Sequence, residues 1–297
     1  MANLKEVKER ISSVTSTRQI TSAMKMVAAA KLRRAQDKIT QMRPYSRKLT
    51  SILQNVSANL DGDTSSQYSE VRPEPENVLL VVVSSDRGLC GAFNNNAFKA
   101  TLKMINEKYS YEYKHNGVHI LPIGKKAYEY FKKRGYNVIV DYYQMFSDLS
   151  FDRAKAAAEF AMEGFVNKRF DVVELIYNEF KNVATQVLKT EQFLPIPESE
   201  LEVVTDDRNI DYIYEPSMEY VVDELIPKSL KIQFYKAILE SNASEHGARM
   251  SAMDQATDNA GEMLKELKLV YNRTRQAAIT KEILEIVGGA EALAAEG

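Results

Sequence analysis

Apolar residues near the C-terminus recur at alternating steps of three and four, and no proline interrupts residues 241–295. Counted from Met250, the stripe contains Met253, Thr257, Ala260, Leu264, Leu267, Tyr271, Thr274 and Ala278. Its 3.5-residue period is typical of a left-handed coiled coil. A helix of about fifty residues is roughly 75 Å long, which exceeds the needs of an ordinary globular core. The pattern therefore predicts that this helix pairs with a partner helix.

A second stripe with the same period lies at the N-terminus. It contains Leu4, Val7, Ile11 and Val14, then Ala28, Leu32, Ala35, Ile39 and Met42, then Leu49, Leu53 and Val56. Between the first two groups the apolar character moves to a shifted face that holds Ile20, Met24 and Val27. Pro44 predicts a bend near Arg43, and the helix should end before the polar run 61–69.

The two stripes would pair antiparallel if the region between them brings the chain back. On periodicity alone, a helical hairpin that serves only as a spacer is an equally good interpretation. Near the C-terminal stripe, a short helix is expected after Pro216. Pro227 would then be the first residue of the long helix, where proline is well tolerated.

The middle of the chain alternates between strand and helix patterns. Strands are expected at 77–85, 117–124, 136–143, 171–180 and 184–195, and helices at 93–109, 125–134 and 151–168. Such alternation implies right-handed crossovers and a mostly parallel sheet with helices packed on it. The last two strands are expected to be antiparallel.

Charge is distributed unevenly although the formal net charge is only −2. Residues 1–50 hold twelve basic and three acidic side chains, whereas residues 198–224 hold ten acidic side chains and one arginine. The balanced total does not favour nucleic acid as a partner, and a basic helix suits an acidic protein partner. A hydrophobic content of 44% is sufficient for a folded core.

Cysteine, histidine and hydropathy patterns exclude several classes of site. Cys90 is the one cysteine, so there is no internal disulfide and no multi-cysteine metal site, and the three histidines are scattered. The longest apolar run, 78–83, is far shorter than a membrane span, and the first ten residues lack a signal-peptide core. Any association with a membrane is therefore expected to occur through other proteins.

A glycine-rich turn, Arg87-Gly88-Leu89-Cys90-Gly91, follows the first expected strand. A dinucleotide fingerprint needs three glycines spaced as GxGxxG and a later acid, and this turn has two glycines at a different spacing. No Walker lysine motif is present either. The turn is therefore not expected to bind a nucleotide, and Cys90 is expected to be a small buried residue. Met24, Met26, Met250 and Met253 are interpreted first as packing residues.

Three separate stretches resemble the gamma subunit of F-type ATP synthase. They read RISSVTSTRQITSAMKMVAAAKLRRAQ (10–36), SSDRGLCGAFN (84–94) and ELKLVYNRTRQAAITKEILEIVGGAEAL (266–293). The resemblance runs from end to end. It implies an α/β protein with a long antiparallel coiled coil, in which paired N- and C-terminal helices flank a central Rossmann-like domain. The expected divisions are an N-terminal helix at 1–60, a linker at 61–76, the α/β domain at 77–195, an acidic connector at 196–215 and the C-terminal helices at 216–297.

The resemblance implies a noncatalytic central rotor shaft of a proton-translocating ATP synthase, without a cofactor of its own. Its partners would be the alpha and beta subunits of the surrounding hexamer, the epsilon subunit and the membrane c-ring. The nearly uncharged tip at 283–295 would turn inside a hydrophobic sleeve. Chloroplast relatives carry a two-cysteine insert and mitochondrial precursors a transit peptide. Neither occurs here, so the cytoplasmic face of a bacterial plasma membrane is the expected location.

The resemblance also implies roles for particular residues. Arg275 and Gln276 match positions that hydrogen-bond to a beta-subunit loop, with Thr280 one turn further. Met24 and Arg249 match facing positions that couple rotation to catalysis, and Arg87 and Lys99 match basic positions near an acidic segment of beta. Without the resemblance, each charged residue would be interpreted as an exposed helix charge worth under about 1 kcal/mol. The alternative function is a stand-alone enzyme whose α/β domain binds a nucleotide and whose helices dimerise it.

Overall fold

The computed structural model describes residues 4–58, 67–183, 185–197 and 218–295. It divides into two compact units, one formed by residues 1–27 with 250–297 and the other by residues 28–249. Residues 198–215 of the expected acidic connector and residues 61–66 of the expected linker lie outside the described residues. We refer to the two parts as the helix-pair unit and the α/β unit.

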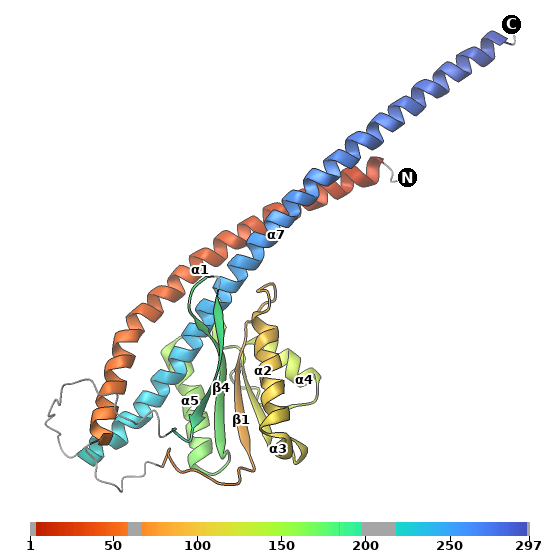
Figure 1. Cartoon of the computed structure of the whole chain (residues 1–297). Helices are drawn as coiled ribbons and strands as arrows, with labels where there is room; N and C mark the ends of the chain where they lie inside the picture. Colours follow the sequence, from red (N-terminus) through yellow and green to blue (C-terminus); the bar gives the residue numbers. More distant parts are fainter. Residues whose placement is uncertain (1–3, 59–66, 184, 198–217, 296–297) are drawn as a thin grey trace. The chain divides into compact units, whose positions relative to one another are not determined.

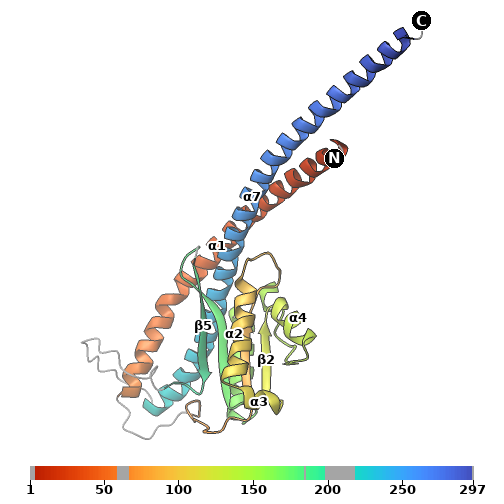
Figure 2. The same cartoon turned by 45° about the vertical axis from the view of Figure 1, so that its right-hand side comes forward.

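Two long helices supply the whole of the helix-pair unit. Helix α1 spans Leu4–Ala58 and helix α7 spans Met218–Ala295, and each also contributes a segment to the α/β unit. Within the helix-pair unit a hydrogen bond joins Thr21 to Thr257 and an ion pair joins Lys25 to Asp254. Residue numbers fall on α7 as they rise on α1, which confirms the predicted antiparallel pairing (Figures 1 and 2).

The predicted stripes form the buried seam of this pair, but the seam is shorter than the sequence suggested. Val7, Met253, Ala260 and Leu264 are buried. Ala278, which we had placed on the stripe, is exposed. Thr21 lies opposite Thr257. Leu4 is seventeen residues before Thr21, so in an antiparallel pair it lies opposite Thr274, which is seventeen residues after Thr257. Helix α1 begins at Leu4, so Ala278 has no partner helix beside it within the described residues.

Proline lies inside both long helices. Helix α1 continues through Pro44 and ends at Ala58, as predicted, and its orange C-terminal part curves (Figure 1). Pro227 is not the first residue of the second long helix, because α7 already begins at Met218. Proline removes one helical hydrogen bond. The flanking Ile226 and Leu230 are buried in the core of the α/β unit, and this burial holds the helix together across the proline.

The α/β unit contains one five-stranded sheet with the order β3-β2-β1-β4-β5. The strands are β1 (Val78–Val83), β2 (Val118–Ile123), β3 (Asn137–Val138), β4 (Val172–Phe180) and β5 (Gln186–Leu194). All neighbouring pairs are parallel except β4 and β5, which confirms the predicted mixed topology. Strand β3 is much shorter than the predicted 136–143. The Tyr143 carbonyl instead accepts a hydrogen bond from the Gly124 amide at 3.0 Å, which draws the chain away from the sheet edge.

Helices cover both faces of the sheet. The predicted helices are observed as α2 (Phe93–Glu107), α4 (Lys125–Lys133) and α5 (Phe151–Val166), whereas the short α3 (Ser110–Lys114) was not predicted. Alternate residues of β1 point to opposite faces. Leu80 packs with Phe98 and Phe131 of α2 and α4, and Leu79 packs in the cluster that contains residues of α5 and α7. Part of α7 is therefore a layer of the α/β unit, and not only a shaft.

Candidate functional site

Arg249 of α7 is bound by the glycine-rich turn of the α/β unit. Its guanidinium donates hydrogen bonds to the carbonyl of Gly88 and, at 3.1 Å, to the carbonyl of Arg87. It also donates to the Glu245 carboxylate at 2.6 Å, one helical turn earlier on α7. Both side chains of this ion pair are about nine-tenths buried. The planar, forked guanidinium suits such a set of acceptors.

The turn can present these carbonyls because two of its residues adopt left-handed backbone conformations. Leu89 has a φ of 64° and Gly91 a φ of 60°, both in the left-handed region. The Asn94 side chain accepts a hydrogen bond from the Ser85 amide at 2.9 Å and so holds the two ends of the turn together. Cys90 is buried beside them, as predicted, and burial raises the pKa of its thiol. Its thiol is therefore suited to packing and not to nucleophilic chemistry.

The electrostatics of this site favour a positively charged group beside Glu245, and the Arg249 guanidinium is that group. Burial raises the pKa of Glu245 despite the neighbouring guanidinium, so the carboxylate depends on Arg249 to remain ionised. A phosphate-binding loop offers amide N–H groups to an anion. At Arg87 and Gly88 this turn offers carbonyl oxygens, and Arg249 already occupies them. The geometry therefore argues against nucleotide binding at the turn.

Of the two predicted basic residues of the α/β unit, Arg87 and Lys99, only Arg87 takes part in the Arg249 site. Arg87 contributes its carbonyl to the Arg249 site, while its own side chain is exposed. Lys99 lies on α2, also with an exposed side chain. Arg87 and Lys99 are therefore accessible on the surface of the chain.

Met24 belongs to the helix-pair unit and is half-buried. The next residue, Lys25, forms an ion pair with Asp254 at 2.5 Å, and the hydroxyls of Thr21 and Thr257 are 2.8 Å apart. Lys25 and Asp254 remain 36% and 48% exposed, so their pairing adds little stability and mainly sets the register of the two helices. Met24 and Arg249 belong to different units.

Arg275, Gln276 and Thr280 lie beyond the end of the buried seam, and all three are exposed. The Thr280 hydroxyl donates to the backbone carbonyl of Gln276 at 2.9 Å. Further along α7 the exposed side chains are large and aliphatic. Between 47% and 72% of the residue surface is exposed at Ile279, Ile283, Leu284, Ile286 and Val287. An apolar surface of this extent indicates a binding partner.

The sequence analysis missed the buried acids of α7. Glu240 is 3% exposed and accepts hydrogen bonds from the Arg43 guanidinium and the Phe180 amide, each at 3.2 Å. Glu245 holds Arg249 in the same way. Both acids lie in segment 237–248, which is rich in small and apolar residues and contains no Lys, Arg or Asp, and that pattern was the available signal.

No metal centre is found in the part of the chain that the structure describes, because no three His, Cys, Asp or Glu side chains cluster there. None of the described helices has a segment that is long and apolar enough to span a membrane.

Comparison with known sequences gives a consistent family. The family model described as ATP synthase matches residues 3–293. The "ATP synthase gamma chain" of Cytophaga hutchinsonii is 60% identical over 294 residues, which cover 99% of both chains. The protein of the same name from Christiangramia forsetii is 54% identical, also over 99% of both chains.

Solved structures contain the same fold. A chain from the OSCP/F1/c-ring part of the Euglena gracilis mitochondrial ATP synthase has a TM-score of 0.67 and 23% identity, and the match covers 98% of this chain and 94% of that one. A chain from the central stalk and c-ring of the Tetrahymena thermophila mitochondrial ATP synthase has a TM-score of 0.54 and 25% identity, with 80% and 99% covered.

Proposed function

The chain belongs to the ATP synthase gamma chain family, and from this premise we propose how its exposed residues perform the work of the rotor. Members of this family are noncatalytic subunits, and their role is rotary coupling. The chain therefore acts as the central shaft that couples ion flow through a membrane ring to ATP synthesis or hydrolysis on other subunits. The observation that carries the detailed proposal is the exposed aliphatic tip of α7.

The tip is the part of the shaft that a surrounding ring of alpha and beta subunits would enclose. Ile283, Leu284 and Ile286 are between 54% and 72% exposed, and of the charged residues beside them Lys281 and Glu285 form an ion pair, while Glu282 adds one further negative charge. Dispersion contacts are weakly directional, so an aliphatic surface can rotate in a hydrophobic sleeve without being held at one angle. This combination supports the tip as a bearing.

Directional contacts are then needed to convert rotation into changes of nucleotide affinity. Arg275 and Gln276 fit this role, because they are exposed just below the bearing and carry hydrogen-bond donors. A contact that forms at one angle and breaks at another gives the surrounding sites different free energies at the two angles. We assign the same kind of contact to Thr280. Met24 is half-buried and the Arg249 guanidinium is bound within the chain, so we assign coupling positions to these two residues without an exposed contact.

The α/β unit would form the lower part of the rotor. Arg87 and Lys99 carry exposed positive charge and are assigned to the acidic segment of beta, while other surfaces of this unit would bind the epsilon subunit and the c-ring. The named relatives are bacterial, which supports the cytoplasmic face of a bacterial plasma membrane as the location. The coupling ion is taken to be the proton.

Affinity purification of the tagged chain from membranes tests this function. Alpha and beta subunits should copurify with the wild-type chain, and replacement of Ile283 by glutamate should reduce their recovery several-fold, because the carboxylate would be buried in the sleeve. Tyr111→Glu is the matched control, since Tyr111 is 68% exposed on α3, outside the tip. Equal recovery of alpha and beta with Ile283→Glu would refute the bearing.

A further inference from the structure

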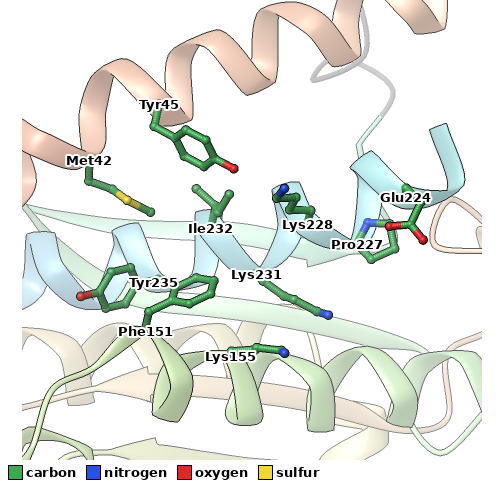
Figure 3. A pocket seen from close by; sticks show the side chains of 10 residues that line it. All are labelled: Met42, Tyr45, Phe151, Lys155, Glu224, Pro227, Lys228, Lys231, Ile232 and Tyr235. Carbon is green, nitrogen blue, oxygen red and sulfur yellow. The ribbon is translucent and has the colours of Figure 1, made fainter. Parts of the chain in front are cut away.

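A cavity of about 720 Å³ opens in the α/β unit between α1, α5 and the first turns of α7 (Figure 3). Its volume lies within the range of small-molecule binding sites, which is about 300 to 1,000 Å³. Its lining residues are Met42, Tyr45, Phe151, Lys155, Glu224, Pro227, Lys228, Lys231, Ile232 and Tyr235. None of the rotor contacts assigned above uses these residues.

One part of the cavity is apolar and rigid. The rings of Phe151 and Tyr235 meet edge to face with their centroids 5.4 Å apart, and Ile232 beside them is 3% exposed. Tyr45 is 48% exposed and faces the cavity from α1, as does Met42 (Figure 3). An aliphatic chain placed among these groups would be removed from water on several sides.

The other part of the cavity carries an excess of positive charge. Lys231 and Lys155 share the single carboxylate of Glu159, with N–O distances of 2.7 Å and 3.8 Å. Lys228 is exposed on the preceding turn of α7 and forms no ion pair among the described residues. Figure 3 shows all three lysine side chains on the side of the cavity away from the paired rings. Two acids, Glu159 and Glu224, stand against these three lysines, so an excess of one positive charge remains.

We propose that this cavity binds a single-chain anionic amphiphile, with its acyl chain against the aromatic groups and its anionic head on Lys228, Lys231 and Lys155. Charge complementarity selects the head, and the aromatic and aliphatic lining selects the chain. A free inorganic anion would leave the apolar part uncovered, and a neutral amphiphile would leave the excess positive charge without a counter-charge. The proposal is independent of the contacts between the shaft and its ring.

Calorimetric titration of the full chain with dodecyl phosphate, kept below its micelle concentration, tests the proposal. One molecule should bind per chain. Lys228→Glu should weaken binding at least about tenfold, because it replaces an attractive charge by a repulsive one, and Tyr45→Ser should weaken it by a smaller factor. Inorganic phosphate and dodecyl maltoside should each bind much more weakly than dodecyl phosphate.

Two matched variants separate a built site from general adsorption. Lys133→Glu and Tyr111→Ser change an exposed lysine and an exposed tyrosine outside the cavity, and should leave the affinity unchanged. Equal weakening by these controls, or full binding of dodecyl maltoside, would overturn the proposal. The same titration of the complex extracted from membranes should also show binding. Loss of binding there would mean that another subunit fills the cavity, and would equally overturn it.

Discussion

Replacing Arg249 by alanine should lower the free energy of unfolding of the α/β unit by about 3 kcal/mol. The substitution leaves the nearly buried Glu245 carboxylate and the carbonyls of Arg87 and Gly88 without their common donor. Urea denaturation of the full chain measures the loss. Arg33→Ala is the matched control, because Arg33 is exposed on α1 in the same unit, and its removal should cost less than about 0.5 kcal/mol.

The pH dependence of this variant identifies the cause. Burial raises the pKa of Glu245, and removal of Arg249 takes away the charge that opposes the increase. An acid whose pKa is raised by folding contributes its full stability below its unfolded pKa and loses it as pH rises through the folded value. The loss of unfolding free energy caused by Arg249→Ala should therefore become smaller as pH falls, and Glu245→Gln in the same chain should remove most of this pH dependence.

A loss of unfolding free energy under about 1 kcal/mol would show that the Arg249 guanidinium is solvated.

Replacing Arg275 and Gln276 together by alanine should reduce ATP synthesis in reconstituted vesicles about tenfold, while the unfolding transition of the isolated chain stays unchanged. Both side chains are exposed, so their loss removes no contact within the described chain. A hydrogen bond with a charged partner is worth about 1.5 to 3 kcal/mol, and 1.4 kcal/mol corresponds to a factor of ten in rate. The measurement compares proton-driven synthesis rates at equal amounts of assembled complex.

Lys268→Ala provides the control for this pair. Lys268 is also exposed, but it lies seven residues before Arg275, which is roughly 10 Å along the helix axis. It should therefore not reach the same loop of beta, and its removal should leave synthesis nearly unchanged. Unimpaired synthesis by the double variant, or equal impairment by Lys268→Ala, would contradict the assignment of Arg275 and Gln276.

Periodicity predicted the C-terminal long helix well because its seam positions repeat without interruption over many turns. Met253, Ala260 and Leu264 were predicted from this repeat, and all three are buried. Ala278 continues the same repeat but is exposed, since the periodicity of one helix does not reveal where its partner begins. The predicted start of the second long helix at Pro227 was wrong for a related reason. Whether a helix continues through a proline depends on tertiary contacts, here the burial of Ile226 and Leu230 in the core of the α/β unit.

The site was harder to predict than the fold. The glycine-rich turn and Arg249 were both noted in the sequence, but 161 residues separate Arg249 from Gly88, and no local pattern links them. Glu245 was overlooked because an acid on a helix is usually solvated, and only the packing of α7 on the α/β unit buries it. The aliphatic tip was visible in the sequence as a run with few charges, but its solvent exposure was not, because that exposure depends on where the partner helix α1 begins.

A disulfide across the helix pair tests the account most directly. Thr21 and Thr257 have hydroxyl oxygens 2.8 Å apart, so cysteines at both positions should oxidise to a disulfide in the assembled complex. The measurement is the rate of ATP-driven rotation of the cross-linked complex. The two helices belong to one shaft, so the complex should rotate at the rate of its reduced form. Failure of the disulfide to form, or arrest of rotation once it has formed, would contradict the paired rotor.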